Sequence, residues 1–133
     1  MPIPNFLTAS LFVVLGGGLG AWLRYTFGVM IFRALGPATQ FPWPTLGVNV
    51  LGSLAMGLLA GWLARHGSHG ESWRLLLGVG LLGGFTTFSA FSLELALMVE
   101  RGAIANAALY AGGSVLAGVA ALFAGLAIMR VAA

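Results

Sequence analysis

The side chains in this chain that could do chemistry are few, and two charged ones fall inside apolar sequence. Cys, Asp and Lys are absent, which excludes disulfides and thiolate metal sites. Arg24 and Glu94 lie within predicted membrane spans, where a charge is usually paired or functional. Arg24 stands near the end of its apolar run, so reaching the lipid–water interface is an alternative role for it. The sequence does not show whether the two charges meet.

Amide and hydroxyl side chains recur at a spacing of four residues, which puts them on one face of a helix. Three rows follow this spacing: Gly16, Gly20, Arg24 and Gly28; Thr45, Asn49, Ser53, Gly57 and Gly61; Asn106, Tyr110, Ser114 and Gly118. Close packing through small residues, with hydroxyls bridging the helices, is a sufficient explanation of such rows. Asn49 is harder to explain by packing, because a carboxamide within a bilayer needs several partners and offers two donors.

The stretch GGFTTFSAFSLELA, residues 83–96, brings polar residues into the third apolar run. Gly83 and Gly84 stand near the midpoint of that run and weaken a helix, and Thr86 or Thr87 can cap a new one. We therefore predict that the third helix is broken near the bilayer centre; a glycine kink sealed by neighbouring helices is the alternative. The freed carbonyls of a broken helix suit a cation such as sodium, and the freed amides favour an anion.

Two phenylalanines follow the predicted break. Phe88 and Phe91 are three residues apart, so their rings lie on neighbouring parts of one helix face. Such pairs usually only pack, but the positive edge of a phenyl ring can also favour an anion. Together with Asn49 and hydroxyls from other helices, the ring edges would line a narrow path without fixed positive charge. Such a path would suit a small anion that must bind weakly enough to leave.

The elements that position these residues are transmembrane helices. Of the 133 residues, 59% are hydrophobic and 7% charged, and the mean hydropathy of +1.00 is far above that of soluble domains. Four runs without charged residues can each cross a hydrocarbon core, which takes about 20 helical residues. We predict an all-α membrane protein with one four-helix domain over residues 1–133, its helices at about 4–32, 44–65, 74–100 and 103–130. The first run lacks the basic start and cleavage site of a signal peptide.

The charges outside the predicted spans give little further direction. If the helices alternate, Arg65, Arg74 and Arg130 lie on one side of the membrane and Arg33 and Arg101 on the other. This near balance leaves two possibilities open, a fixed orientation or insertion both ways with pairing to an inverted copy. His66 and His69 lack a third metal ligand nearby, so a solvated loop is expected there. The net charge of +3 comes from helix ends and does not indicate nucleic-acid binding.

Three segments together resemble the Fluc (CrcB) family of bacterial fluoride channels. They are GGGLGAWLRY in the first helix, TLGVNVLGS in the second and GGFTTFSAFSLE in the third. The resemblance implies a passive fluoride-selective channel in the bacterial inner membrane that exports cytoplasmic fluoride for fluoride resistance. It also implies an antiparallel dual-topology homodimer with two pores and a central structural sodium ion.

The resemblance also assigns expected roles to single residues. Asn49, Phe88 and Phe91 would line the fluoride pathway, Thr45 and Glu94 would lie close to it, and Arg24 would support the end of the first helix. The carbonyls of Gly83 and Thr86 would bind sodium. Tyr110 and Ser114 match a Tyr and Ser pair at the same spacing in the family's fourth helix, and they would also belong to the fluoride pathway. The chain departs from the family pattern at Pro44, where glycine is expected, and at Ala90, where a hydroxyl residue is common.

Two other functions remain open on the residues alone. A small proton-coupled multidrug exporter also has four helices, and Glu94 is the one candidate for its carboxylate. Such an exporter would need that carboxylate in the first helix, where this chain has Arg24. A non-conducting assembly would need only the close packing of small residues.

Overall fold

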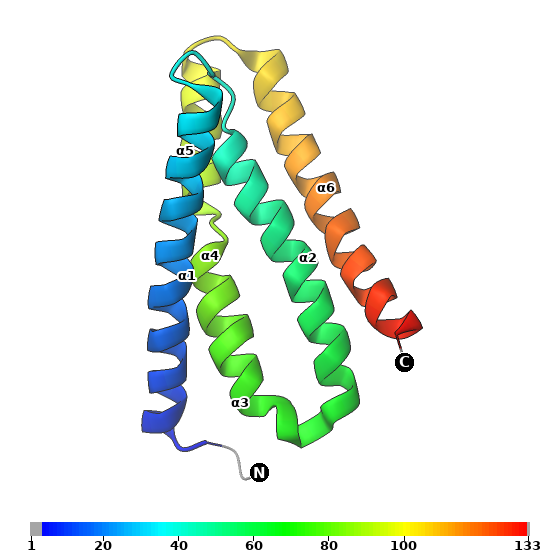
Figure 1. Ribbon diagram of the computed structural model, residues 1–133. Helices are drawn as coiled ribbons and strands as arrows, with labels where there is room; N and C mark the ends of the chain where they lie inside the picture. Colours follow the sequence, from blue (N-terminus) through cyan, green and yellow to red (C-terminus); the bar gives the residue numbers. More distant parts are fainter. Residues whose placement is uncertain (1–3, 133) are drawn as a thin grey trace.

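The computed structural model describes residues 4–132, apart from the side chains of Ser68 and His69, so half of the His66 and His69 pair lies outside the described residues. Successive membrane-length helices run in opposite directions (Figure 1), and no strand occurs in the described part. Helix α1 (Phe6–Leu35), α2 (Trp43–His66) and α6 (Ile104–Val131) are continuous. With the composite third element, four helices are long and apolar enough to cross a membrane.

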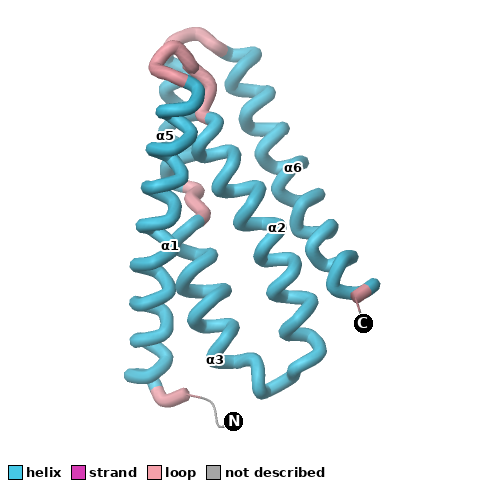
Figure 2. Tube along the Cα trace, in the orientation of Figure 1, coloured by secondary structure: helices cyan, strands magenta, loops and turns pink. Residues whose placement is uncertain are grey.

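The third element consists of several short pieces. After a 3₁₀ turn, η1 (Gly67–Gly70), come α3 (Glu71–Trp73), the π-helical η2 (Arg74–Leu82) and α4 (Gly83–Phe85). Residues 86–88 are not helical, Thr86 is extended with φ −80° and ψ 159°, and α5 (Ser89–Glu100) then follows (Figure 2). Gly83 itself is helical, with φ −62° and ψ −38°. The backbone therefore leaves the helical conformation at Thr86, after the two glycines.

The helix ends follow from local sequence chemistry. The side chain of Asn5 accepts a 2.9 Å hydrogen bond from the Thr8 amide and caps α1. At its other end α1 reaches Leu35, beyond the expected residue 32, and stops where Gly36 takes φ 78°. Pro44 sits in the first turn of α2, where its missing N–H costs nothing.

Helix α1 and the third element cross through glycine, and both rise in the same direction in Figure 1. Gly16 and Gly20 are the buried residues of α1. A Cβ at Gly16 would collide with the backbone carbonyl of Leu76 and lie 2.8 Å from the Leu81 nitrogen, and one at Gly20 would lie 2.8 Å from the nitrogen of Phe85. The two backbones therefore touch directly, which is how helices without side chains at the interface gain van der Waals contact.

Helices α2 and α6 form the other extensive contact, and they also run parallel (Figure 1). A Cβ at Gly57 would meet the backbone of Leu122, and one at Gly125 would lie 2.7 Å from the nitrogen of Leu58. Further towards the start of both helices, Gly118 faces Ser53. The two rows of residues at four-residue spacing, one on each helix, therefore lie against each other.

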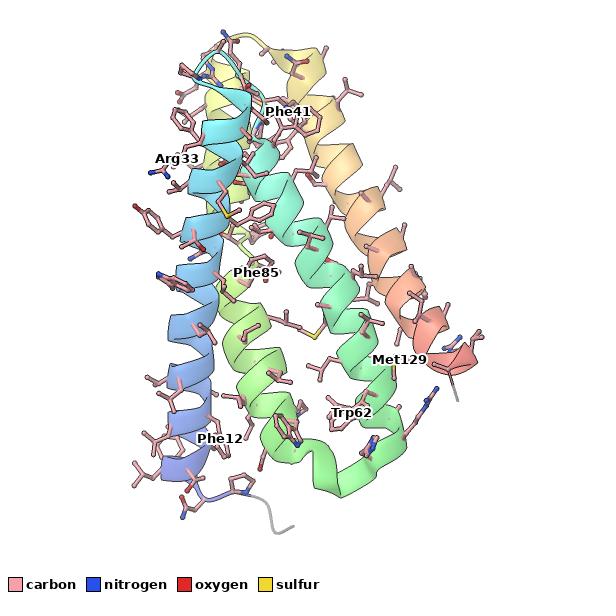
Figure 3. All side chains as sticks on the ribbon, in the orientation of Figure 1. Phe12, Arg33, Phe41, Trp62, Phe85 and Met129 are labelled. Carbon is pink, nitrogen blue, oxygen red and sulfur yellow. The ribbon has the colours of Figure 1, made fainter. Side chains whose placement is uncertain are left out.

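Aromatic side chains close the two ends of the bundle, with Phe41 near one end and Trp62 near the other (Figure 3). At the first end Met98, Ala107 and Tyr110 are buried, and Phe41 packs edge-on to Tyr110 with ring centroids 5.5 Å apart. At the second end the Trp62 ring stacks on the His66 ring, with ring centroids 4.2 Å apart. Few other large side chains are buried, because the outward faces of membrane helices meet lipid rather than water.

Candidate functional site

Asn49 is hydrogen-bonded to the backbone of the non-helical residues 86–88, which we call the 86–88 segment. Its Nδ2 donates to the Thr87 carbonyl at 2.9 Å, and its Oδ1 accepts from the Thr87 amide at 2.8 Å. Both backbone groups would otherwise lack a partner in an apolar interior, at a cost of about 1–3 kcal/mol each. An NH₂ group has two donors, and within residues 4–132 the second N–H of this carboxamide has no partner. Asn49 thus fixes the segment and keeps one donor for another acceptor.

The threonines on either side of this junction have different tasks. Thr86 donates its hydroxyl to the Leu82 carbonyl at 2.9 Å, which completes the helix that ends there. The buried Thr87 accepts a 3.2 Å bond from the Ala90 amide and so caps α5. The amide of Thr86 donates to Leu82 as well. Within residues 4–132, no hydrogen bond ends on the carbonyl oxygen of Gly83 or of Thr86.

Glu94 is hydrogen-bonded to two of the other candidate residues. Thr45 donates to its Oε1 at 2.7 Å, and the Tyr110 hydroxyl donates to its Oε2 at 2.7 Å. These short bonds join α2, α5 and α6 through a single carboxyl group. Arg24 is not a partner of Glu94. The ion pair found among the described residues joins Arg74 and Glu71.

Replacing Tyr110 with phenylalanine is expected to lower the free energy of unfolding by about 1.5–3 kcal/mol, because one carboxylate oxygen of Glu94 loses its donor. Thermal unfolding of the purified protein in detergent measures this loss. The matched control is Tyr25→Phe, since Tyr25 is 70% exposed and Tyr110 only 1%. Equal melting temperatures for the two variants would contradict a structural role for the Glu94 bonds.

The two phenylalanines of the third element have different surroundings. Their ring centroids are 5.7 Å apart at an angle of 39°. Phe91 also packs against Tyr110, with centroids 5.0 Å apart. Phe88 is 78% exposed, so most of this ring is uncovered.

Ser114 and Arg24 are the remaining predicted site residues. The Ser114 hydroxyl is buried and has no hydrogen-bond partner within the described residues. Its place one turn before Gly118 on α6 puts it level with Asn49 in the parallel register of α2 and α6. Arg24 lines a large cavity beside α1, together with Thr87.

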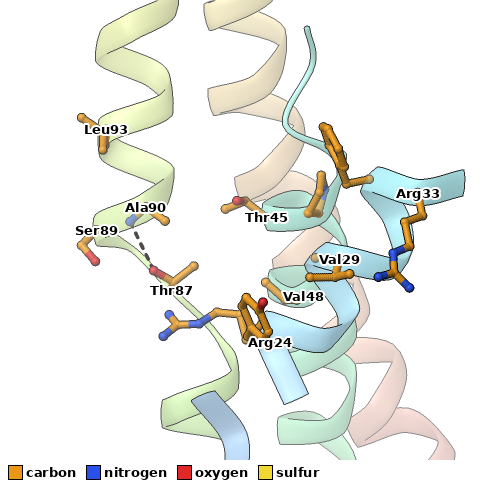
Figure 4. Close-up of a pocket in the computed structure, with 13 residues that line it drawn as sticks. Arg24, Val29, Arg33, Thr45, Val48, Thr87, Ser89, Ala90 and Leu93 are labelled. Carbon is orange, nitrogen blue, oxygen red and sulfur yellow. Dashed lines mark hydrogen bonds between the residues drawn. The ribbon is translucent and has the colours of Figure 1, made fainter. Parts of the chain in front are cut away.

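Two cavities flank the 86–88 segment, and Thr87 lines both. The larger, which we call the arginine cavity, has a volume of about 840 Å³ between α1, α2 and α5 and contains Arg24 and Arg33 (Figure 4). The smaller, which we call the Phe88 groove, has about 290 Å³ and is lined by Asn49, Ser53, Phe88 and neighbours. The segment held by Asn49 therefore separates a cavity with two cations from a groove with aromatic and amide walls.

Thr87 and Phe41 have larger structural roles than the sequence indicated. Thr87 provides the backbone groups that Asn49 binds, and Phe41 covers the Tyr110 ring. The sequence placed Thr87 only as a possible cap. Its partner is 38 residues away, so no local spacing could have identified the pair.

Comparisons with known proteins identify the family of this chain. Residues 11–126 match the model of the family described as CrcB-like protein, Camphor Resistance (CrcB). A fluoride-specific ion channel FluC from Novosphingobium aromaticivorans is 64% identical over 124 residues, which cover 93% of this chain and 98% of that protein. Proteins of the same name from Phenylobacterium zucineum and Caulobacter vibrioides are 57% and 51% identical, over 93% and 90% of this chain and 97% and 94% of theirs.

These relatives are ion channels by name and not enzymes, and they match almost the whole chain. Together with the four membrane-length helices, the match makes this a multi-pass membrane protein. The chain belongs to the CrcB family.

Proposed function

We propose that this protein is a passive, fluoride-selective channel that exports cytoplasmic fluoride across the bacterial inner membrane and so confers fluoride resistance. The working unit is an antiparallel homodimer with two pores and a central structural sodium ion. The observation that carries the proposal is the Phe88 groove, where Asn49 keeps a free N–H beside an exposed phenyl ring. The names of the relatives identify the anion.

The groove offers fluoride neutral partners only. A carboxamide N–H donates a hydrogen bond, and the edges of Phe88 and Phe91 present the positive part of the ring quadrupole. Arg24 and Arg33 stand in the other cavity, where they raise the local anion concentration without trapping the ion at the narrow point. Weak binding at the groove lets the ion leave, as conduction requires.

A second copy of the chain would complete the site. Phe88 is 78% exposed although it lines the groove, and the Ser114 hydroxyl is buried without a partner in the described chain. Arginines divide almost evenly between the two ends of the bundle, so insertion both ways is allowed. An inverted partner laid against the groove gives two equivalent pathways.

The residues Gly83 and Thr86 fit a sodium ion. Neighbouring carbonyls are occupied, since that of Leu82 accepts from Thr86 and that of Thr87 accepts from Asn49. The carbonyls of Gly83 and Thr86 accept no such bond within residues 4–132. An interrupted membrane helix commonly offers such carbonyls to a sodium ion. Two from each subunit would hold the ion at the dimer axis near the bilayer centre, where it would join the subunits and take no part in conduction.

The multidrug exporter is less consistent with the site. An exporter needs an open carboxylate that exchanges protons for cations, and both oxygens of Glu94 already accept hydrogen bonds from Thr45 and Tyr110. A non-conducting assembly explains the glycine crossings, but it gives no reason for a free amide donor in a groove.

Fluoride efflux from loaded liposomes tests the proposed function. Purified protein is reconstituted, valinomycin is added to release potassium, and a fluoride electrode records the anion. Rapid fluoride release without chloride release is expected. Absence of fluoride release from well-folded protein would rule the channel out, and proton-driven uptake of a cationic dye would favour the exporter.

The dimer and the sodium ion need their own tests. A reporter fused to the C-terminus is expected to be accessible from both sides of the membrane; accessibility from one side alone would refute inverted pairing. Isotopic sodium is expected to remain with the purified dimer during gel filtration. Protein that retains none at full dimer content would refute the central site.

A further inference from the structure

Ser53 is a hydroxyl residue of α2 that the proposed pathway does not yet include. It follows Asn49 by one helical turn and is half-buried. It lines the Phe88 groove together with Asn49 and Phe88. Its spacing from Asn49 places both side chains on the same face of α2.

Several other hydroxyls donate a hydrogen bond to the backbone of their own helix. Ser10, Thr86 and Ser92 each donate to the carbonyl four residues earlier, at 2.7, 2.9 and 2.9 Å. This back-bond is the ordinary way to satisfy a hydroxyl in an apolar helix. Ser53 makes no such bond within residues 4–132. Its O–H is therefore available to an acceptor in the groove.

The opposite helix has no side chain at the position facing this hydroxyl. Gly118 of α6 faces Ser53, and a Cβ there would lie 3.4 Å from Oγ. On the other side, a Cβ at Gly52 would collide with the Thr86 methyl group, so α2 lies tightly against the 86–88 segment one residue before Ser53. The hydroxyl thus lies beside a position of α6 that has no side chain, and Ser53 is among the residues that line the groove.

We propose that Ser53 is a further fluoride-binding residue, whose hydroxyl donates to the anion one helical turn beyond Asn49. The inference rests on the proposed function and adds a second step to the pathway in one subunit. A neutral O–H suits this step, because hydrogen bonds from O–H groups to anions are short and strong. It adds no fixed charge that would hold the ion.

Ser53→Ala tests the inference in the liposome assay. Loss of one hydrogen bond to an anion is expected to reduce fluoride flux about ten-fold. It is also expected to raise the fluoride concentration at which flux is half-maximal. Ser53→Thr restores the hydroxyl and is expected to restore most of the flux. The matched control is Ser10→Ala, whose hydroxyl donates to Phe6 on α1; its flux is expected to equal that of the unchanged protein.

The outcomes separate this inference from the proposed function. Fluoride flux from the unchanged protein with equal flux from Ser53→Ala overturns the role of Ser53 and leaves the channel intact. No flux from the unchanged protein overturns both. A variant that only lowers the yield of folded channels would leave the half-maximal concentration unchanged, which also overturns the inference. If Ser53→Ala does not fold, Ser53→Cys keeps the side-chain size with a weaker donor. Ser53→Cys is then expected to raise the fluoride concentration at which flux is half-maximal, and an unchanged value overturns the inference.

Discussion

Asn49→Ala is expected to reduce fluoride flux by about 100-fold. The substitution removes the free N–H that faces the groove, and it also removes both partners of the Thr87 backbone. Two unpaired buried groups cost about 1–3 kcal/mol each, and each tenfold change in rate corresponds to about 1.4 kcal/mol. The 86–88 segment would therefore rearrange to find other partners, and the groove would lose its shape.

Liposome flux per amount of folded protein measures this effect, with the content of folded protein determined by gel filtration. The control is Asn106→Ala, because Asn106 is an exposed asparagine on α6 and loses no contact of this kind. Asn49→Ala flux equal to that of the control would show that neither the amide donor nor the bonds to Thr87 matter for conduction.

Gly16→Ala is expected to cause a large loss of stability. A single methyl group there would collide with the Leu76 carbonyl and approach the Leu81 nitrogen to 2.8 Å. Both are backbone atoms that cannot turn aside as a side chain can. Overpacking of this kind typically costs about 1–3 kcal/mol even in a core of side chains. We expect α1 to separate from η2 and the protein to aggregate during purification.

Gly18→Ala, in the same helix, is expected to cause no loss of stability. Gly18 has open space around its missing Cβ, and alanine favours a helix by about 0.5–1 kcal/mol over glycine. This variant is expected to melt at or above the temperature of the unchanged protein, measured by thermal unfolding in detergent. Gly16→Ala and Gly18→Ala with the same melting temperature would contradict the backbone contact between α1 and η2.

Composition and spacing predicted much of this architecture. Charges divide the chain into four membrane-length runs, and the structure has four helices of that kind. The four-residue spacing also identified the correct packing faces. Gly57 and Gly118 stand on the rows predicted for α2 and α6, and both face the other helix. These features depend on neighbours along one helix, so a single sequence contains them.

The contacts within the site depend on distant residues and could not be predicted from spacing. Glu94 meets Thr45 across 49 positions and Tyr110 across 16. No local rule links such positions, and the intramembrane acid could equally have faced Arg24. The glycine pair was interpreted as the weak point of the third helix. In the structure Gly83 is helical, and Gly84 lies against the Gly17 backbone, where a Cβ would collide. Gly84 therefore allows the third element to pack closely against α1.

The bond between Asn49 and Thr87 also has a consequence for biogenesis. Translation starts at the N-terminus, so Asn49 leaves the ribosome 38 residues ahead of Thr87. Without Asn49, the amide and carbonyl of Thr87 would have no hydrogen-bond partner in hydrocarbon. The third span therefore cannot be released into lipid as an independent segment, as an uninterrupted apolar helix can. It must leave the insertion machinery together with α2, which makes the second and third spans one unit of membrane insertion.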